Sequence, residues 1–237
     1  MTEHPNVYLF DLDGTLLPMD QEVFTKTYFA SLTNRFKELY DPKELIDATW
    51  SGIRAMVKND GSEINSAAFW NAFSDIYGKD VLDQKEDFEE YYKTDFENVS
   101  SSCGFNKEIR DVVMEIKSLG YRTVVATNPV FPTVATEKRI RWARFDPEDF
   151  ELYTTYDNSH YCKPNLMYYK EILEKIGFEA DECMMVGNDV KEDMVAKELG
   201  MKVFLLTDCL INSSNKDISE YPNGGFSDLL DFIKKCK

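Results

Sequence analysis

The sequence has only two histidines and no two cysteines in C-x-x-C spacing. Its five cysteines, an odd number, stand far apart at Cys103, Cys162, Cys183, Cys209 and Cys236. This pattern argues against a disulfide framework or a zinc site, and it favours a reduced chain in the cytoplasm. Because the sequence has only two histidines, it offers almost no candidate for the histidine of a Ser-His-Asp catalytic triad.

Long apolar runs and basic residues are also scarce. No segment approaches the length needed to span a bilayer, and residues 1–10 lack the features of a signal peptide. The 27 Lys and Arg are outnumbered by 43 Asp and Glu, which gives a net charge of −16. We therefore expect no nucleic acid or membrane partner. An anionic substrate would need local cations, including a metal.

Short apolar runs predict five strands, and several of them are apolar at nearly every position, as in strands buried on both faces. The runs are residues 7–10, 122–127, 152–156, 183–187 and 202–207. Segments between the last four have helical character, at residues 131–144, 164–176 and 190–199. This alternation predicts an α/β fold with a Rossmann-like open parallel sheet and helices on both faces.

Residues 18–103 interrupt the alternation with helix formers and aromatic residues, and predict four or five amphipathic helices without a strand. We therefore expect an α/β core of residues 1–17 and 104–237, and an all-helical cap of residues 18–103 inserted after the first strand. The cap could cover the sheet edge where such folds bind ligands. Its aromatic side chains are expected to pack mostly among the helices, with one or two lining a pocket. They are Phe24, Tyr28, Phe29, Trp50, Phe69, Trp70, Phe73 and Tyr77.

Polar residues follow the predicted strands where each strand ends. They are Asp11 and Asp13, Thr127 and Asn128, Lys163, and Asn188, Asp189 and Asp193. In a parallel sheet these ends lie on one edge, so the groups should converge. Taken alone, the first pair could be a solvated turn and Lys163 a solvated loop lysine. The basic run RIRWAR at 139–144 is expected to be a solvated helix face.

Four motifs in this order resemble those of the haloacid dehalogenase (HAD) superfamily of phosphohydrolases, in the subgroup with a helical (C1) cap. They are D-x-D-G-T at 11–15, hydrophobic-T-N at 126–128, K-P at 163–164 and G-N-D-x-x-x-D at 187–193. The resemblance covers about residues 6–208. It implies a Mg²⁺-dependent phosphohydrolase that acts on a small phosphorylated metabolite through an aspartyl-phosphate intermediate.

The resemblance also implies roles for the carboxylates at the first strand end. Asp11 would be the nucleophile and Asp13 the acid and base, and their spacing puts both side chains on one face of an extended chain. Gly14 would allow the sharp turn, and Thr15 would orient the loop.

The remaining motif residues would hold the phosphate and the metal. Lys163 would neutralise charge, and Thr127 and Asn128 would bind the phosphoryl group. Mg²⁺ would take Asp11, the backbone carbonyl of Asp13, and Asp189. Either Asn188 or Asp189 could occupy this last position. A carboxylate is the better ligand, so Asp189 is favoured and Asn188 would touch an outer-shell water. Asp193, or alternatively Glu192, would fasten Lys163.

Other functions on the same fold stay open. A phosphomutase shares these residues, and a 2-haloacid dehalogenase needs neither Asp13 nor the metal. A non-catalytic HAD-like binding module would be expected to have lost Asp11, Asp13 or Lys163, and all three are present. The sequence leaves open the substrate, and whether the protein is a monomer or a homodimer.

Overall fold

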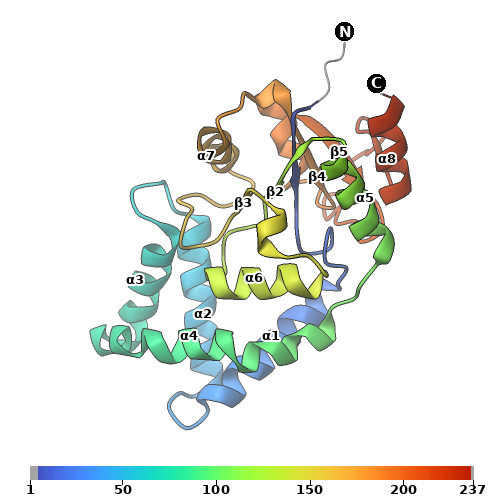
Figure 1. The fold of residues 1–237 in the computed structure, drawn as a ribbon. Helices are drawn as coiled ribbons and strands as arrows, with labels where there is room; N and C mark the ends of the chain where they lie inside the picture. The colour runs from blue at the N-terminus through green and yellow to red at the C-terminus, as the bar shows by residue number, and fades with distance from the viewer. Residues whose placement is uncertain (1–4, 236–237) are drawn as a thin grey trace.

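The computed structural model describes residues 5–235, so His4 and Cys236 lie outside the described part. Its centre is a parallel six-stranded sheet in the order β3-β2-β1-β4-β5-β6 (Figure 1). The strands are β1 (Val7–Phe10), β2 (Arg122–Val125), β3 (Leu152–Tyr153), β4 (Cys183–Gly187), β5 (Lys202–Leu206) and β6 (Asn223–Gly224). β1 and β4 are buried at every position, as their apolar sequences predict. The predicted parallel α/β fold is confirmed.

Helices cover both faces of the sheet, because alternate strand residues point to opposite sides. Tyr8 and Phe10 pack with α5 (Lys107–Ser118) and α8 (Phe226–Lys235), whereas Val7 and Leu9 pack with α7 (Leu166–Ile176). Figure 1 shows α7 and α8 on opposite sides of the strands. Short 3₁₀ helices complete this part, at η3 (Pro147–Asp149), η4 (Ala180–Glu182) and η5 (Met194–Leu199).

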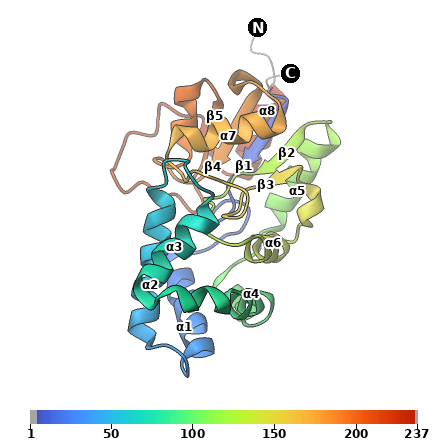
Figure 2. The ribbon, with the colours of Figure 1, turned by 90° about the vertical axis from the view of Figure 1, so that its left-hand side faces the viewer.

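Most residues from 21 to 102 are helical and lie on one side of the sheet, and α6 (Thr133–Trp142) lies between α4 and the strands (Figures 1 and 2). They form α1 (Gln21–Phe36), α2 (Pro42–Val57), α3 (Asn65–Tyr77), η1 (Lys79–Gln84), α4 (Lys85–Lys93) and η2 (Asp95–Ser102). Asp20 and Asp41 cap α1 and α2 by accepting hydrogen bonds from their first-turn amides. None of the described helices combines the length and the apolar character that a bilayer crossing requires.

The two ends of this helical segment lie side by side. The amide of Gly104 donates to the carbonyl of Pro18 at 2.7 Å, and Met19 pairs with Cys103 in an antiparallel bridge. The chain therefore leaves the sheet and returns to it at one place. The division into a core and a cap with boundaries at these connections stays a prediction.

Some elements differ from the sequence predictions. Only the second half of 190–199 is helical, because the Asp189 carboxylate accepts hydrogen bonds from the amides of Lys191 and Glu192 and holds a turn there. β3 is shorter than predicted, and just beyond its end the Thr154 hydroxyl donates to the carbonyl of Thr127 at 2.6 Å. The sequence analysis did not predict α5, α8 or the two-residue strand β6.

Candidate active site

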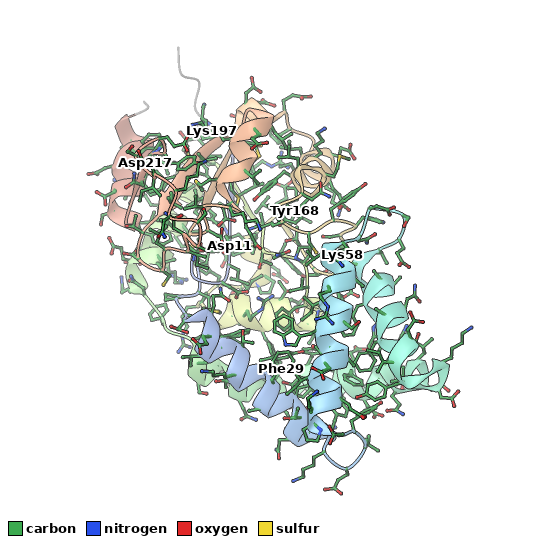
Figure 3. The ribbon with its side chains drawn as sticks, turned by 180° about the vertical axis from the view of Figure 1, so that it is seen from behind. Asp11, Phe29, Lys58, Tyr168, Lys197 and Asp217 are labelled. Atoms are coloured by element: carbon green, nitrogen blue, oxygen red, sulfur yellow. The ribbon has the colours of Figure 1, made fainter. Side chains whose placement is uncertain are left out.

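The carboxyl-terminal ends of β1, β2 and β4 border a cavity of about 350 Å³. Polar residues that follow these strands line it, namely Asp11, Asp13, Thr127, Asn128, Asn188, Asp189, Glu192 and Asp193. The amide of Asp11 donates to the carbonyl of Val186 at 2.9 Å, which extends the pairing of β1 with β4 beyond the strand. Figure 3 shows Asp11 between the sheet and the helical segment. The structure thus brings the residues at these three strand ends together.

Lys163 joins the same group from the loop between β3 and α7. Its Nζ donates to Oδ1 of Asp11 at 2.8 Å and to Oδ1 of Asp193 at 2.6 Å. Burial disfavours the ammonium charge, but the two carboxylates outweigh burial and hold the pKa of Lys163 well above its ordinary value. With 2% of its surface exposed, Lys163 is not a solvated loop lysine.

Asp193, rather than Glu192, pairs with this lysine. The second carboxylate oxygen of Asp193 accepts from the amide of Asp189 at 2.9 Å. Gly187 makes room for it, since a Cβ there would lie 2.2 Å from Asp193 Oδ2. Glu192 instead accepts from the side-chain amide of Asn128 at 3.2 Å, and burial raises the pKa of Glu192 to about 7.

The environment of Asp11 is crowded with negative charge. Burial raises its pKa to about 7, Lys163 opposes this shift, and the nearby Asp193 and Asp13 add to it. Lys163 binds only Oδ1, and no residue within 5–235 donates a hydrogen bond to Oδ2. Oδ2 is therefore the Asp11 oxygen left for another partner in the cavity.

Asp13 has a partner that the sequence analysis did not find. Its Oδ2 forms an ion pair with Nη1 of Arg139, on α6. The guanidinium also donates to Oγ1 of Thr136 at 3.2 Å and lies 4.4 Å from the ring centroid of Phe131. Burial raises the pKa of Asp13, although Arg139 acts to lower it. Oδ1 of Asp13 is buried with no hydrogen-bond partner in the described structure, so it is free to carry a proton.

The prediction that residues 139–144 form a solvated face is wrong for Arg139, which is fully buried. On α6 the buried positions are Ala135, Thr136, Arg139 and Ile140, whereas Arg141 is exposed. This is the spacing of one helix face. The sequence did contain a signal for this burial, because Arg139 lies on the same helix face as small and apolar residues. The neighbouring basic residues obscured it.

Asn188 ties the loop after β1 to the end of β4. Its Oδ1 accepts from the Thr15 hydroxyl at 3.0 Å, and its Nδ2 donates to the carbonyl of Cys209 at 2.6 Å. Gly14 has a φ of +86°, and a Cβ there would lie 2.4 Å from Nδ2 of Asn188. Glycine is therefore required at position 14 both for its backbone conformation and for this close approach.

Thr127 and Asn128 lie opposite this loop and also border the cavity. The carbonyl of Thr127 accepts from the hydroxyls of Thr154 and Tyr168, at 2.6 and 2.8 Å, which fixes the end of β2. Oδ1 of Asn128 is buried without a hydrogen-bond partner among residues 5–235. The next residue, Pro129, offers no backbone N–H, so Asn128 is the backbone donor at this point.

The donor set fits a hard cation. Within the described residues, no three or more His, Cys, Asp or Glu side chains are placed as a metal site. The set implied by the resemblance needs only two such side chains, Asp11 and Asp189, together with the Asp13 carbonyl. Oδ1 of Asp189 binds backbone amides, whereas Oδ2 has no hydrogen bond in the described chain. Oxygen donors and surplus negative charge suit Mg²⁺.

Helices α1 and α2 supply the opposite wall of the cavity, together with the chain after β2. Its residues are Gln21, Phe24, Thr25, Tyr28 and Phe29 from α1, Trp50 and Ile53 from α2, and Val130 and Phe131. Four of the predicted aromatic residues therefore line this cavity, more than the one or two expected. An apolar face that meets a cavity has the same sequence pattern as one that meets a core.

Comparisons with known proteins identify the family. The family of haloacid dehalogenase-like hydrolases matches residues 5–208. Pyrophosphatase PpaX of Bacillus cereus (strain AH820) is 23% identical over 198 residues, which cover 83% of this chain and 81% of that protein.

Solved structures share the fold. A HAD phosphatase from Thermococcus onnurineus superposes with a TM-score of 0.61 at 16% identity, over 96% of this chain and 97% of the other. HAD-hydrolase YfnB from Bacillus subtilis, described as bound to magnesium, gives 0.56 at 15% identity, over 98% and 99%. At such identities the structural likeness concerns the fold alone.

Proposed function

Because the chain belongs to the family of haloacid dehalogenase-like hydrolases, we propose that it is a Mg²⁺-dependent phosphatase of a small phosphorylated metabolite. The observation that carries this proposal is Lys163, buried between Asp11 and Asp193, two carboxylates that line the cavity. A buried cation that fixes one oxygen of a carboxylate suits a carboxylate nucleophile whose target is anionic.

The reaction follows from the two free carboxylate oxygens. Oδ2 of Asp11 attacks phosphorus, and the new O–P bond forms as the bond to the leaving oxygen breaks. Asp13 gives the proton on Oδ1 to that oxygen, so the product leaves as a neutral alcohol. Asp13 then takes a proton from water, whose oxygen attacks the phosphoaspartate, and phosphate leaves as Asp11 is regenerated. Lys163 offsets the charge on Asp11 throughout.

The phosphate and the metal would occupy the groups at the strand ends. Thr127, Asn128 and Lys163 would bind the phosphoryl oxygens. Asp11, the backbone carbonyl of Asp13, and Asp189 would hold Mg²⁺, which when bound offsets the repulsion between a carboxylate and a phosphate dianion.

We further propose that residues 18–103 act as a cap on a core of residues 1–17 and 104–237. Since both connections pass side by side at Pro18 and Gly104, the helices can move as one unit without disturbing the strands. The free cysteines among the described residues, Cys103, Cys162, Cys183 and Cys209, support a reducing compartment such as the cytoplasm.

The purified protein is expected to release phosphate from p-nitrophenyl phosphate when Mg²⁺ is present. Removing the metal with EDTA should lower the rate at least about 100-fold, because Lys163 alone then offsets the repulsion between Asp11 and the phosphate. Added Mg²⁺ should restore the rate, which excludes denaturation by the chelator. Full activity after exhaustive chelation would contradict the metal requirement.

The choice between the two candidate metal residues can be tested separately. Asp189→Asn is expected to raise the Mg²⁺ concentration for half-maximal activity at least about tenfold, since it replaces a charged ligand with a neutral one. Asn188→Ala should lower thermal stability by releasing Thr15 and the Cys209 carbonyl, with a smaller change in Mg²⁺ requirement. The reverse result would assign the metal to Asn188.

A further inference from the structure

The wall of the cavity opposite the carboxylates is apolar and largely aromatic. Helix α1 directs a single face toward it, because Tyr28 lies four residues after Phe24 and next to Phe29. Tyr28 meets Phe131 with ring centroids 5.4 Å apart, and Phe29 meets Trp50 at the same distance. Figure 3 shows Phe29 in the helical segment, on the far side of the space from the sheet. The aromatic rings thus form one wall made by two helices and the chain after β2.

This wall continues deeper between the helices. A second cavity of about 20 Å³ shares Tyr28, Ile53, Val130 and Phe131 with the first. Beyond them its lining is again mainly aromatic, with Leu32, Thr49, Phe69, Trp70, Phe88, Tyr92 and Tyr156. At about 20 Å³ this second cavity is the size of a single water molecule, so an organic group would lie in the first cavity.

Trp50 leaves a large aromatic surface available beside the cavity. It is 38% exposed, whereas Phe24, Tyr28 and Phe29 are buried. Burying such a ring against a ligand would remove apolar surface from water, which is favourable. The polar cap residues in this wall are already engaged, since the Thr25 hydroxyl donates to the carbonyl of Gln21 and the Gln21 amide donates to that of Asp13.

The charges around the cavity disfavour a second anionic group on the ligand. Five acidic side chains line it, and the described lining residues include no lysine, arginine or histidine. Lys58, at the end of α2, is exposed and is not part of the lining. The phosphoryl group has Lys163 and the proposed metal as partners. A second carboxylate or phosphate would lie against aromatic rings without a counter-charge, which costs free energy.

Resting on the phosphatase function proposed above, we propose a substrate class. The substrate is a phosphate monoester of an uncharged alcohol or phenol whose organic part is aromatic or otherwise apolar. That part packs against Phe29, Trp50 and Tyr28 while the phosphoryl group lies at Asp11. Monoesters with a second anionic group are poor substrates.

Three esters test this class, and two of them differ only in a remote carboxylate. We expect kcat/KM for benzyl phosphate to exceed that for 4-carboxybenzyl phosphate about 10- to 100-fold, and to exceed that for ethyl phosphate about tenfold. Phosphate release measured with Mg²⁺ gives all three values. A carboxylated ester hydrolysed as well as benzyl phosphate, or better, overturns the substrate class and leaves the phosphatase function standing. No hydrolysis of any ester overturns the phosphatase function, and the substrate class with it.

Substitutions in the aromatic wall of the cavity test whether this wall determines the preference between esters. Ile53→Lys adds a cation to a partly buried lining position and should lower the preference for benzyl over 4-carboxybenzyl phosphate at least about tenfold. Trp50→Ala should lower the ratio of kcat/KM for benzyl over ethyl phosphate about tenfold. Phe105→Ala removes another exposed ring, which does not line the cavity, and should change neither ratio. Unchanged ratios in both lining variants would overturn the placement of the organic group.

Discussion

Asp11→Asn is expected to lose phosphate release, with kcat at least about 1,000-fold below that of the native protein. The carboxamide is a far weaker nucleophile than the carboxylate, and it cannot be regenerated by hydrolysis of a phosphoaspartate. Initial rates with saturating p-nitrophenyl phosphate and Mg²⁺ measure the effect. The protein should stay folded, because Lys163 keeps Asp193 at 2.6 Å as a buried partner.

Asp20→Asn provides the matched control, since it makes the same chemical change outside the cavity. Asp20 is exposed and caps α1, and asparagine caps helices about as well as aspartate. Its activity should therefore stay within about twofold of the native value. Native-like turnover by a homogeneous Asp11→Asn preparation would refute Asp11 as the nucleophile.

The proposed covalent step can be tested directly. Acid quenching during turnover should leave a phosphorylated peptide that contains Asp11, and Asp11→Asn should leave none. A phosphomutase would form the same phosphoaspartate, so the product decides between the two reactions. Isomerisation of a hexose 1-phosphate without phosphate release would assign the mutase, whereas free phosphate assigns the phosphatase.

The sheet and its polar strand ends could be predicted from sequence because each depends on few neighbouring residues. VYLF and CMMVG are apolar at every position but the last glycine, which marks central strands of a parallel sheet. Asp11 and Asn188 follow their strands directly, and Thr127 comes two residues after β2, so the topology alone brings them to one edge. The pairing of Lys163 with Asp193 crosses from one loop to another. It was predicted only because the family resemblance implied it.

Features that depend on how helices pack could not be predicted in the same way. Whether an apolar ring on α1 meets a core or a cavity depends on where α2 and the chain after β2 lie. Arg139 is the clearest case, because its burial requires a carboxylate that comes from a different part of the chain, at Asp13. A basic run usually lies on a surface, and only the packing of α6 makes one of its members an internal ion-pair partner.

Arg139→Met is the second substitution with a large expected effect. It keeps much of the side-chain volume but leaves Asp13 without its buried counter-charge. Removing one partner of such a pair should lower the free energy of unfolding by about 3 kcal/mol. Chemical denaturation with Mg²⁺ absent measures this loss. Arg141→Met is the control on the same helix, since Arg141 is exposed and contacts Glu137 at 3.3 Å, and it should cost less than about 1 kcal/mol.

Catalysis should also suffer in Arg139→Met, at a temperature where the variant is folded. In the native protein Arg139 holds Oδ2 of Asp13, which leaves Oδ1 as the oxygen that we propose protonates the leaving group. Without the guanidinium the carboxyl can rotate away from that position. We expect kcat/KM for benzyl phosphate, whose alcohol leaves poorly, to fall about 100-fold. For p-nitrophenyl phosphate, whose phenolate needs little protonation, the fall should be about tenfold or less.

This difference between leaving groups separates a positioning role from a structural one. If Arg139 only stabilises the fold, proton transfer from Asp13 is unaffected in the folded variant. The rate then changes by the same factor for both esters. If Arg139 positions Asp13, the loss grows as the leaving group becomes worse. Arg139→Lys keeps the charge without the planar, forked guanidinium, and should recover stability more than it recovers the rate with benzyl phosphate. An equal loss of kcat/KM for both esters would refute a positioning role for Arg139 and leave the proposed role of Asp13 as the acid untouched.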